Sequence, residues 1–125
     1  MRRLFIAAAQ LAFLGSALCA TFDVDGDLMR GIDDTAKSLD SNVAQKDAKA
    51  AAADARSLVD TFAHVESHYA EKPETADAVS FAHHTQELAA QTLKAIEAND
   101  FDAAGDSVAQ LTRSCKSCHE VYKKD

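Results

Sequence analysis

Three residues near the end of the chain have the types and the spacing to hold a cofactor: Cys115, Cys118 and His119. Two thiols three positions apart, followed at once by an imidazole, form the pattern that attaches haem through two thioethers. The thiols add across the two vinyl groups of one haem, and the imidazole reaches the iron. On a helix, residues three and four apart share a face, so these side chains can address one ligand. The motif predicts one covalently attached haem c, with His119 as an axial iron ligand.

The beginning of the chain predicts export. Residues 1–3 form a short basic segment, residues 4–18 form an apolar segment, and small residues follow. This is the pattern of a secretory signal peptide, and it is too short for a membrane span. Small residues favour cleavage after Cys19, with cleavage after Ala20 as the alternative. We expect a periplasmic protein without a membrane span, made of a signal peptide and one domain over residues 1–19 and 20–125.

Composition predicts an all-α fold. Alanine is abundant, Trp is absent, aromatic residues make up 6% of the chain, and there is one Pro. Apolar residues recur at helical spacing and never alternate over a useful length. Pro73 and the pair Asn99-Asp100 indicate breaks between helices. The predicted helices cover residues 24–43, 47–71, 75–98 and 102–123, and their short connections favour an antiparallel up-down-up-down four-helix bundle.

The apolar stripes predict which residues form the core. In the last helix the stripe contains the two cysteines: Ala104, Val108, Leu111, Cys115, Cys118 and Tyr122. The apolar stripe of the second helix is expected to run from Ala48 to Tyr69. In the third helix the predicted stripe is Val79, Ala82, Gln86, Ala89, Leu93 and Ile96. The steps of four and three are typical of a helix bundle, so haem is expected to be bound in the core by the last helix.

Met29 is the candidate for the second iron ligand. It lies near the start of the first helix, on its apolar stripe, and the antiparallel topology places that start beside the end of the last helix. A thioether there is expected to take the axial position opposite His119. Two alternatives remain: Met29 as an ordinary core residue, or Leu28 over the iron if the helical phase differs by one position.

The C-terminal residues resemble those of a known family. The sequence Arg113-x-Cys115-x-x-Cys118-His119-x-x-Tyr122-Lys123, at the end of a four-helix chain, resembles the class II c-type cytochromes, which comprise the cytochromes c′ and their low-spin relatives. The resemblance implies that the last helix binds haem and that the first helix fills the distal position. High-spin members place an apolar residue there and bind small gases, whereas low-spin members place a Met. Members often pair through their first two helices, so the resemblance also allows a homodimer.

Four further histidines compete with Met29 as ligands. His64 and His68 lie late in the second helix, and His83 and His84 lie early in the third, so all are expected toward the haem end. His64 and His68 align with polar residues, which favours solvated surface histidines. A metal site at the His64/His68 pair has no evident third ligand.

The charge pattern bears on partners. The formal net charge of −7 argues against nucleic acid or an anionic membrane as a partner. Basic residues nevertheless surround the motif: Arg113, Lys116, Lys123 and Lys124. We expect a molecule with its positive end at the haem, where this patch would dock redox partner proteins, unless the cations merely complement the helix dipole.

Three functions remain after these observations. The first is a one-electron carrier with His/Met-ligated iron, which needs no catalytic groups and would not be an enzyme. The second is a cytochrome c′-like protein with five-coordinate haem that binds gases such as NO. The third, a thiol oxidoreductase using Cys115 and Cys118, is disfavoured because that chemistry needs the pair at a helix N-terminus, where the dipole lowers the thiol pKa.

Overall fold

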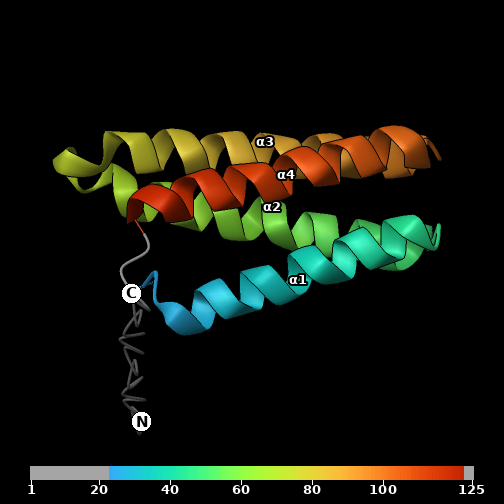
Figure 1. Cartoon of the computed structure of the whole chain (residues 1–125), viewed down its shortest axis with the longest axis horizontal. Coiled ribbons are helices and arrows are strands. Elements are labelled where there is room, and N and C mark those ends of the chain that lie inside the picture. Colours follow the sequence, from blue (N-terminus) through green and yellow to red (C-terminus); the bar gives the residue numbers. More distant parts are fainter. Residues whose placement is uncertain (1–22, 123–125) are drawn as a thin grey trace, which may run out of the picture.

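The computed structural model describes residues 23–122, which form four long helices and one short 3-10 turn (Figure 1). The elements are α1 (Gly26–Ala44), α2 (Ala48–Ala70), η1 (Pro73–Thr75), α3 (Ala76–Glu97) and α4 (Phe101–Tyr122). Their bounds lie within about two residues of those expected from the sequence, which is the ordinary uncertainty of helix ends. The predicted signal peptide and Lys123 and Lys124 lie outside the described residues.

The helices form the predicted antiparallel bundle. α1 packs against α2 and α4, α2 against α3, and α3 against α4. Figure 1 shows that α1 and α3 begin at the end of the bundle where α2 and α4 finish. We call this end, which holds residues 115–119, the motif end, and the opposite end, with the connections at 45–47 and 98–100, the loop end. None of the described helices is long and apolar enough to cross a membrane.

Two connections of the same design close the loop end. Lys46 follows α1 with φ 58° and Asn99 follows α3 with φ 59°, so both are left-handed. In each, the residue after the left-handed one donates its backbone N–H five residues back: Asp47 to Asn42 at 2.9 Å and Asp100 to Ala95 at 2.8 Å. This is the Schellman arrangement that ends helices.

The same two aspartates also start the helices that follow. Asp47 Oδ1 accepts the N–H of Ala50, and Asp100 Oδ1 accepts the N–H of Ala103, both at 3.0 Å. Each aspartate therefore satisfies a backbone donor in the first turn of its helix. Thr75, the residue before α3, does not cap that helix in this way, because its hydroxyl donates to the carbonyls of Tyr69 and Lys72.

Replacing Lys46 by glycine should stabilise the protein. A side chain in the left-handed region costs about 1–2 kcal/mol, and glycine removes this cost at a smaller penalty in the unfolded state. We expect Lys46→Gly to raise the free energy of unfolding by about 0.5–1 kcal/mol, measured by urea denaturation. Asn99→Gly is the matched control. It should raise the free energy of unfolding by less, because Asn tolerates the left-handed conformation. Equal gains at the two positions would contradict the explanation.

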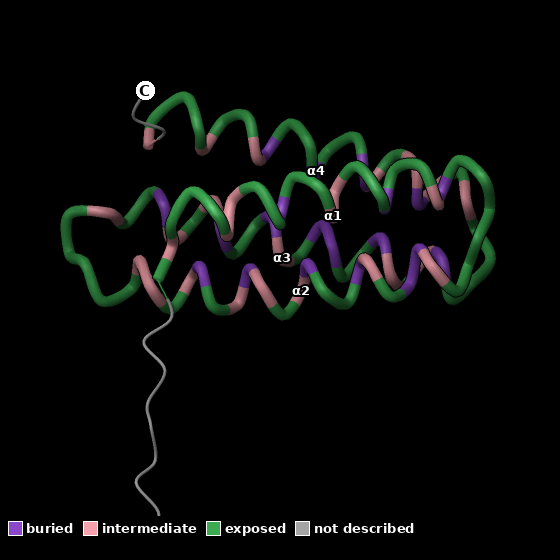
Figure 2. The backbone as a smooth tube through the Cα atoms, turned by 90° about the horizontal axis from the view of Figure 1, so that it is seen from below, coloured by how far each residue is buried: buried purple, intermediate pink, exposed green. Residues whose placement is uncertain are grey.

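The core is complete from the loop end to the middle of the bundle (Figure 2). Leu39, Ala55 and Leu111 have no exposed surface, and Leu58, Leu88 and Val108 have 1–2%. Alanines at many core positions let the helices pack closely. The apolar stripe of α1 is completed by Ile32 and Val43, which are also buried.

The predicted core of two helices needs correction. Ala48 is exposed because it is the first residue of α2. In α3, Val79, Gln86 and Leu93 are only half-buried, while the buried positions include Ala78, Thr85, Leu88 and Thr92. The prediction is right for Ala82, Ala89 and Ile96, which are buried, and one position late at the other three. Only apolar residues were followed, so two buried threonines were not recognised as core residues.

Candidate functional site

The cysteine and histidine motif occupies the last two turns of α4. Cys115 and Cys118 are half-buried, and Cys115 packs against the hydrophobic core. His119 is exposed. One helical turn separates the two thiols, and they face the interior because they continue the buried stripe of Val108 and Leu111.

The environment of the thiols opposes thiolate chemistry. Burial raises the pKa of the Cys115 thiol to about 11, and the neighbouring Cys118 and Asp33 of α1 act in the same direction. Burial also raises the pKa of Cys118. A thiol redox pair needs depressed pKa values, so this geometry disfavours the thiol oxidoreductase.

Two apolar side chains of α1 lie at the level of the motif. Leu28 and Met29 are both half-buried, and both pack against the core cluster, as Cys115 does. Asp25 fixes the start of this helix, because its Oδ1 accepts the N–H of Leu28 at 2.8 Å. Met29, the predicted ligand, therefore lies on the inward side of α1, and Leu28 lies on that side as well.

The core is incomplete at the motif end. Beyond Ile32, Val65 and Ser114, the inward-facing residues change from buried to half-buried in α1, α2 and α4. The residues concerned are Val24, Leu28, Met29, Tyr69, Cys115, Cys118 and Tyr122. Figure 1 shows α1 running obliquely, so that it starts apart from α2 and α4.

These residues fit a haem group. They combine a partly open apolar lining with two thiols one turn apart and an imidazole next to the second thiol, which is the donor set that holds haem c. A large apolar cofactor would cover the half-exposed side chains, as burial of apolar surface favours.

Comparison with known proteins identifies the family of this chain. A family model described as Cytochrome C' matches residues 20–123. The chain belongs to the cytochrome c′ family. No curated protein and no solved structure was found to match it. This membership confirms the expected class II cytochrome and the four-helix bundle. The members of this family are haem c proteins.

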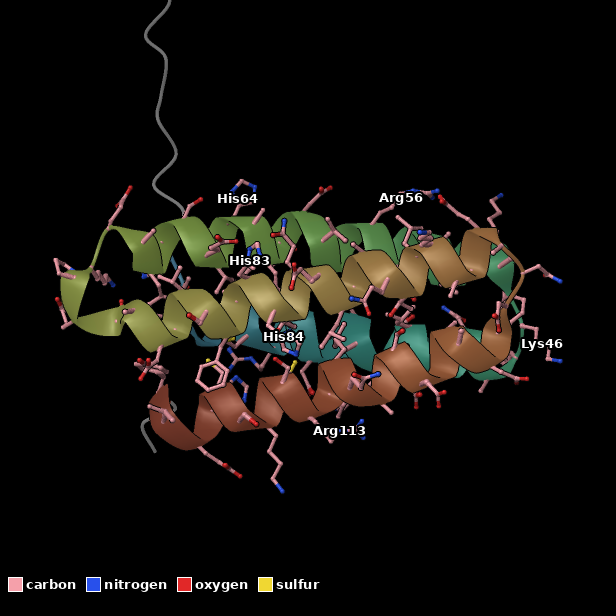
Figure 3. The ribbon with its side chains drawn as sticks, turned by 90° about the horizontal axis from the view of Figure 1, so that it is seen from above. Lys46, Arg56, His64, His83, His84 and Arg113 are labelled. Atoms are coloured by element: carbon pink, nitrogen blue, oxygen red, sulfur yellow. The ribbon has the colours of Figure 1, made fainter. Side chains whose placement is uncertain are left out.

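The remaining histidines lie on the surface of this family member, largely as expected. His64, His83 and His84 are exposed, and Figure 3 shows His64 at the outer edge of α2, His83 between α2 and α3, and His84 between α3 and α4. His83 lies between two carboxylates, with Nδ1 3.2 Å from Glu66 and Nε2 3.4 Å from Glu87. Within residues 23–122, no group of three His, Cys, Asp or Glu side chains could hold a metal ion.

His68 differs from the other three because it is half-buried. Its Nε2 lies 2.9 Å from Nζ of Lys72, and its ring meets the edge of Tyr69. Tyr69 in turn lies 6.1 Å from Tyr122, measured between ring centroids. Burial raises the pKa of Tyr69, and the nearby Cys118 and Tyr122 add to the shift. His68 thus borders the aromatic side of the motif end.

The described residues at the motif end carry charges of both signs. Arg113 and Lys116 are exposed on α4 and have no ion pair within the described part of the chain. The antiparallel fold brings further charged residues, from the start of α1 and from the segment that joins α2 to α3, to the same end: acidic Asp23, Asp25, Asp27, Glu71, Glu74 and Asp77, and basic Arg30 and Lys72. Arg113 and Lys116 form a local patch on one face of α4, because the topology mixes both signs at this end.

Sequence reasoning missed one buried polar contact beside the motif. Thr85 of α3 and Ser114 of α4 are 2% and 7% exposed, and their hydroxyl oxygens lie 2.6 Å apart. Both residues were outside the predicted apolar stripes. The signal that was available is their register: each stands at a spacing of three or four from neighbouring core residues.

Proposed function

We propose that this protein is an exported mono-haem c-type cytochrome that carries single electrons. In this proposal Cys115 and Cys118 hold the haem covalently, His119 is one axial ligand of the iron, and Met29 is the other. The observation that supports it best is the placement of Met29 on the inward side of α1, at the level of the motif on α4. Family membership supports the cofactor.

Haem, when bound, supplies a one-electron couple, and a Met/His ligand pair raises its potential. The protein contributes rigidity, because both ligand-bearing residues belong to long helices whose far ends are fully packed. α1 is tied to α2 near its end, where Ser38 and Asn42 donate to Oδ2 of Asp54 at 2.7 and 2.8 Å. Cys115, Leu28 and Met29 exclude water from the inner side of the site by their apolar surface.

A second candidate is a gas-binding haem protein of the cytochrome c′ kind. Leu28 supports this alternative, because it directly precedes Met29, is half-buried like it, and also packs against the core. With Leu28 over the iron, the sixth position would stay open to small gases such as NO. The start of α1 would allow this, since Ile32 is its first buried residue.

Intact mass after expression in a host that exports and attaches haem tests the proposal. We expect a chain beginning at Ala20 that carries one haem resistant to acidic organic extraction. The family match begins at the same residue, which supports periplasmic export after cleavage of residues 1–19. A mature chain that contains no covalent haem would contradict the proposed function.

We propose the basic residues around the motif as the docking face for redox partners, and call them the basic patch. It comprises Arg113, Lys116, Lys123 and Lys124, of which Arg113 and Lys116 are described and exposed. Opposite charges on a partner would speed encounter rather than strengthen the final complex. The patch fits an acidic protein surface near the haem.

Neutralising the patch should slow electron exchange with anions. We expect Lys116→Gln to lower the rate with ferricyanide about twofold at low salt, in stopped-flow measurements, because one unit charge near the site is removed. Lys49→Gln, an exposed change on α2 at the loop end, is the control and should have little effect. An equal effect of the two substitutions, or indifference to salt, would contradict the docking face.

A further inference from the structure

A hydrogen bond between two buried side chains ties α3 to α4 beside the motif. The hydroxyl of Thr85 donates to the carbonyl oxygen of Phe81 at 2.7 Å. Its single proton is therefore used, so Ser114, whose oxygen lies 2.6 Å away, must be the donor in the contact between them. The result is a directed chain from Ser114 to Thr85 to the backbone of α3.

The other buried residues of these two helices are apolar or bond within their own helix. They combine small side chains, such as Ala82 and Ala104, with larger ones, such as Leu88 and Leu111. Apolar contacts of this kind are not directional, whereas a hydrogen bond between two side chains is. A rotation or slip of α4 by one residue would separate the two hydroxyls and leave a buried polar group without its partner, which is costly. Polar pairs in helix interfaces can select one register in this way.

The alignment matters because Ser114 directly precedes Cys115. Successive residues of a helix point about 100° apart, so a one-residue rotation would turn the inward-facing Cys115 toward a neighbouring helix or solvent. The same rotation would move Cys118 and His119, since the three residues belong to one rigid helix. No other hydrogen bond between side chains of α3 and α4 is present in the described structure.

We propose that Thr85 and Ser114 are positioning residues for the haem. Their hydrogen bond sets the rotation of α4 about its axis, and through it the direction in which Cys115, Cys118 and His119 present their ligating atoms. This inference rests on the proposed attachment of haem to the two cysteines. It adds to that function two residues that touch neither the iron nor the thioethers.

Ser114→Ala is the sharpest test, because Thr85 keeps its bond to Phe81 and no buried group loses its only partner. Proton NMR of the ferric holoprotein reports the orientation of the haem and its axial ligands through the shifts of the haem methyl groups. We expect Ser114→Ala to displace these resonances or to give a second set. Amide exchange in residues 115–119 should accelerate roughly fivefold, as expected for the loss of one ordinary hydrogen bond.

Thr92→Val provides the matched control. Thr92 is also a fully buried threonine of α3, but its hydroxyl bonds to the carbonyl of Leu88 in its own helix, at 2.8 Å. We expect Thr92→Val to leave the haem methyl pattern unchanged. Thr85→Val should change the pattern as Ser114→Ala does. Thr85→Ser should give the wild-type pattern, because it keeps the hydroxyl. The double variant Thr85→Val/Ser114→Ala should change the pattern no more than either single variant.

The outcomes separate this inference from the proposed function. Intact mass first establishes whether each variant carries covalent haem, and a wild-type chain without it would overturn the attachment itself. If haem is attached and Ser114→Ala leaves both the methyl pattern and the exchange of residues 115–119 as in the wild type, the positioning role is wrong. A change of similar size in Thr92→Val would also overturn it, because the effect would then be general loosening of α3.

Discussion

Met29→Ala should convert the ferric protein from a low-spin to a high-spin spectrum. Alanine cannot reach the iron, so a five-coordinate or water-ligated site would replace the His/Met pair, and the weak charge-transfer band of a Met–iron bond would vanish. The reduction potential should fall, because Met ligation raises it. Visible absorption spectra of both oxidation states and a potentiometric titration measure these changes.

Leu28→Ala is the control for this experiment. Leu28 is half-buried like its neighbour, packs against the same core cluster and loses a similar amount of apolar surface on truncation. It should leave the protein low-spin and cause only a modest loss of stability. A wild-type protein that is already high-spin, with a spectrum that responds to Leu28→Ala and not to Met29→Ala, would instead favour the gas-binding candidate.

The double variant Cys115→Ser/Cys118→Ser should lose covalent haem and loosen one end of the bundle. The inward-facing side chains of the motif end are half-exposed without the cofactor, whereas those near the loop end are fully packed. Hydrogen exchange should therefore accelerate in the first turns of α1 and the last turns of α4. We expect the exchange rate there to rise by roughly two orders of magnitude. This corresponds to a loss of about 2.7 kcal/mol of stability, which is what a ligand present at about 100 times its dissociation constant contributes.

The single variants provide the graded comparison. Cys115→Ser and Cys118→Ser each keep one thiol, so haem should remain attached by one thioether and the exchange pattern should stay close to that of the wild type. Exchange near Leu39 and Ala104 should change little in any variant, because these residues are buried far from the motif. Uniform acceleration along all four helices would contradict a cofactor that completes one end of the core.

Helix positions were predictable because local signals agree with the tertiary structure. Asp47 and Asp100 cap the helices that follow them, and the predicted break at Asn99-Asp100 is present, with Asn99 left-handed. The four apolar stripes then identified the bundle, since helices with one apolar face and short connections must pack as antiparallel neighbours.

The phase of α3 was not predictable in the same way. Thr85 and Thr92 are polar by composition but buried in the fold, since each hydroxyl is satisfied by a carbonyl four residues back. A stripe drawn through apolar residues alone therefore rotates away from the true interface. Which charges share one end of the bundle also depends on the tertiary structure: Asp25 and Lys116 are far apart in sequence, and antiparallel packing brings their helix ends together.

The sequence was enough to predict the cofactor class, because thioether attachment of haem uses two thiols at the spacing of Cys115 and Cys118, and the adjacent imidazole of His119 suits the iron. It also determined the helices and their antiparallel order, which follow from short-range capping and periodicity. The tertiary structure decided which side chains share the motif end, how deeply they are buried, and how α4 is rotated against α3. Those properties depend on contacts between residues distant in the chain, such as Thr85 and Ser114, and local spacing does not encode them.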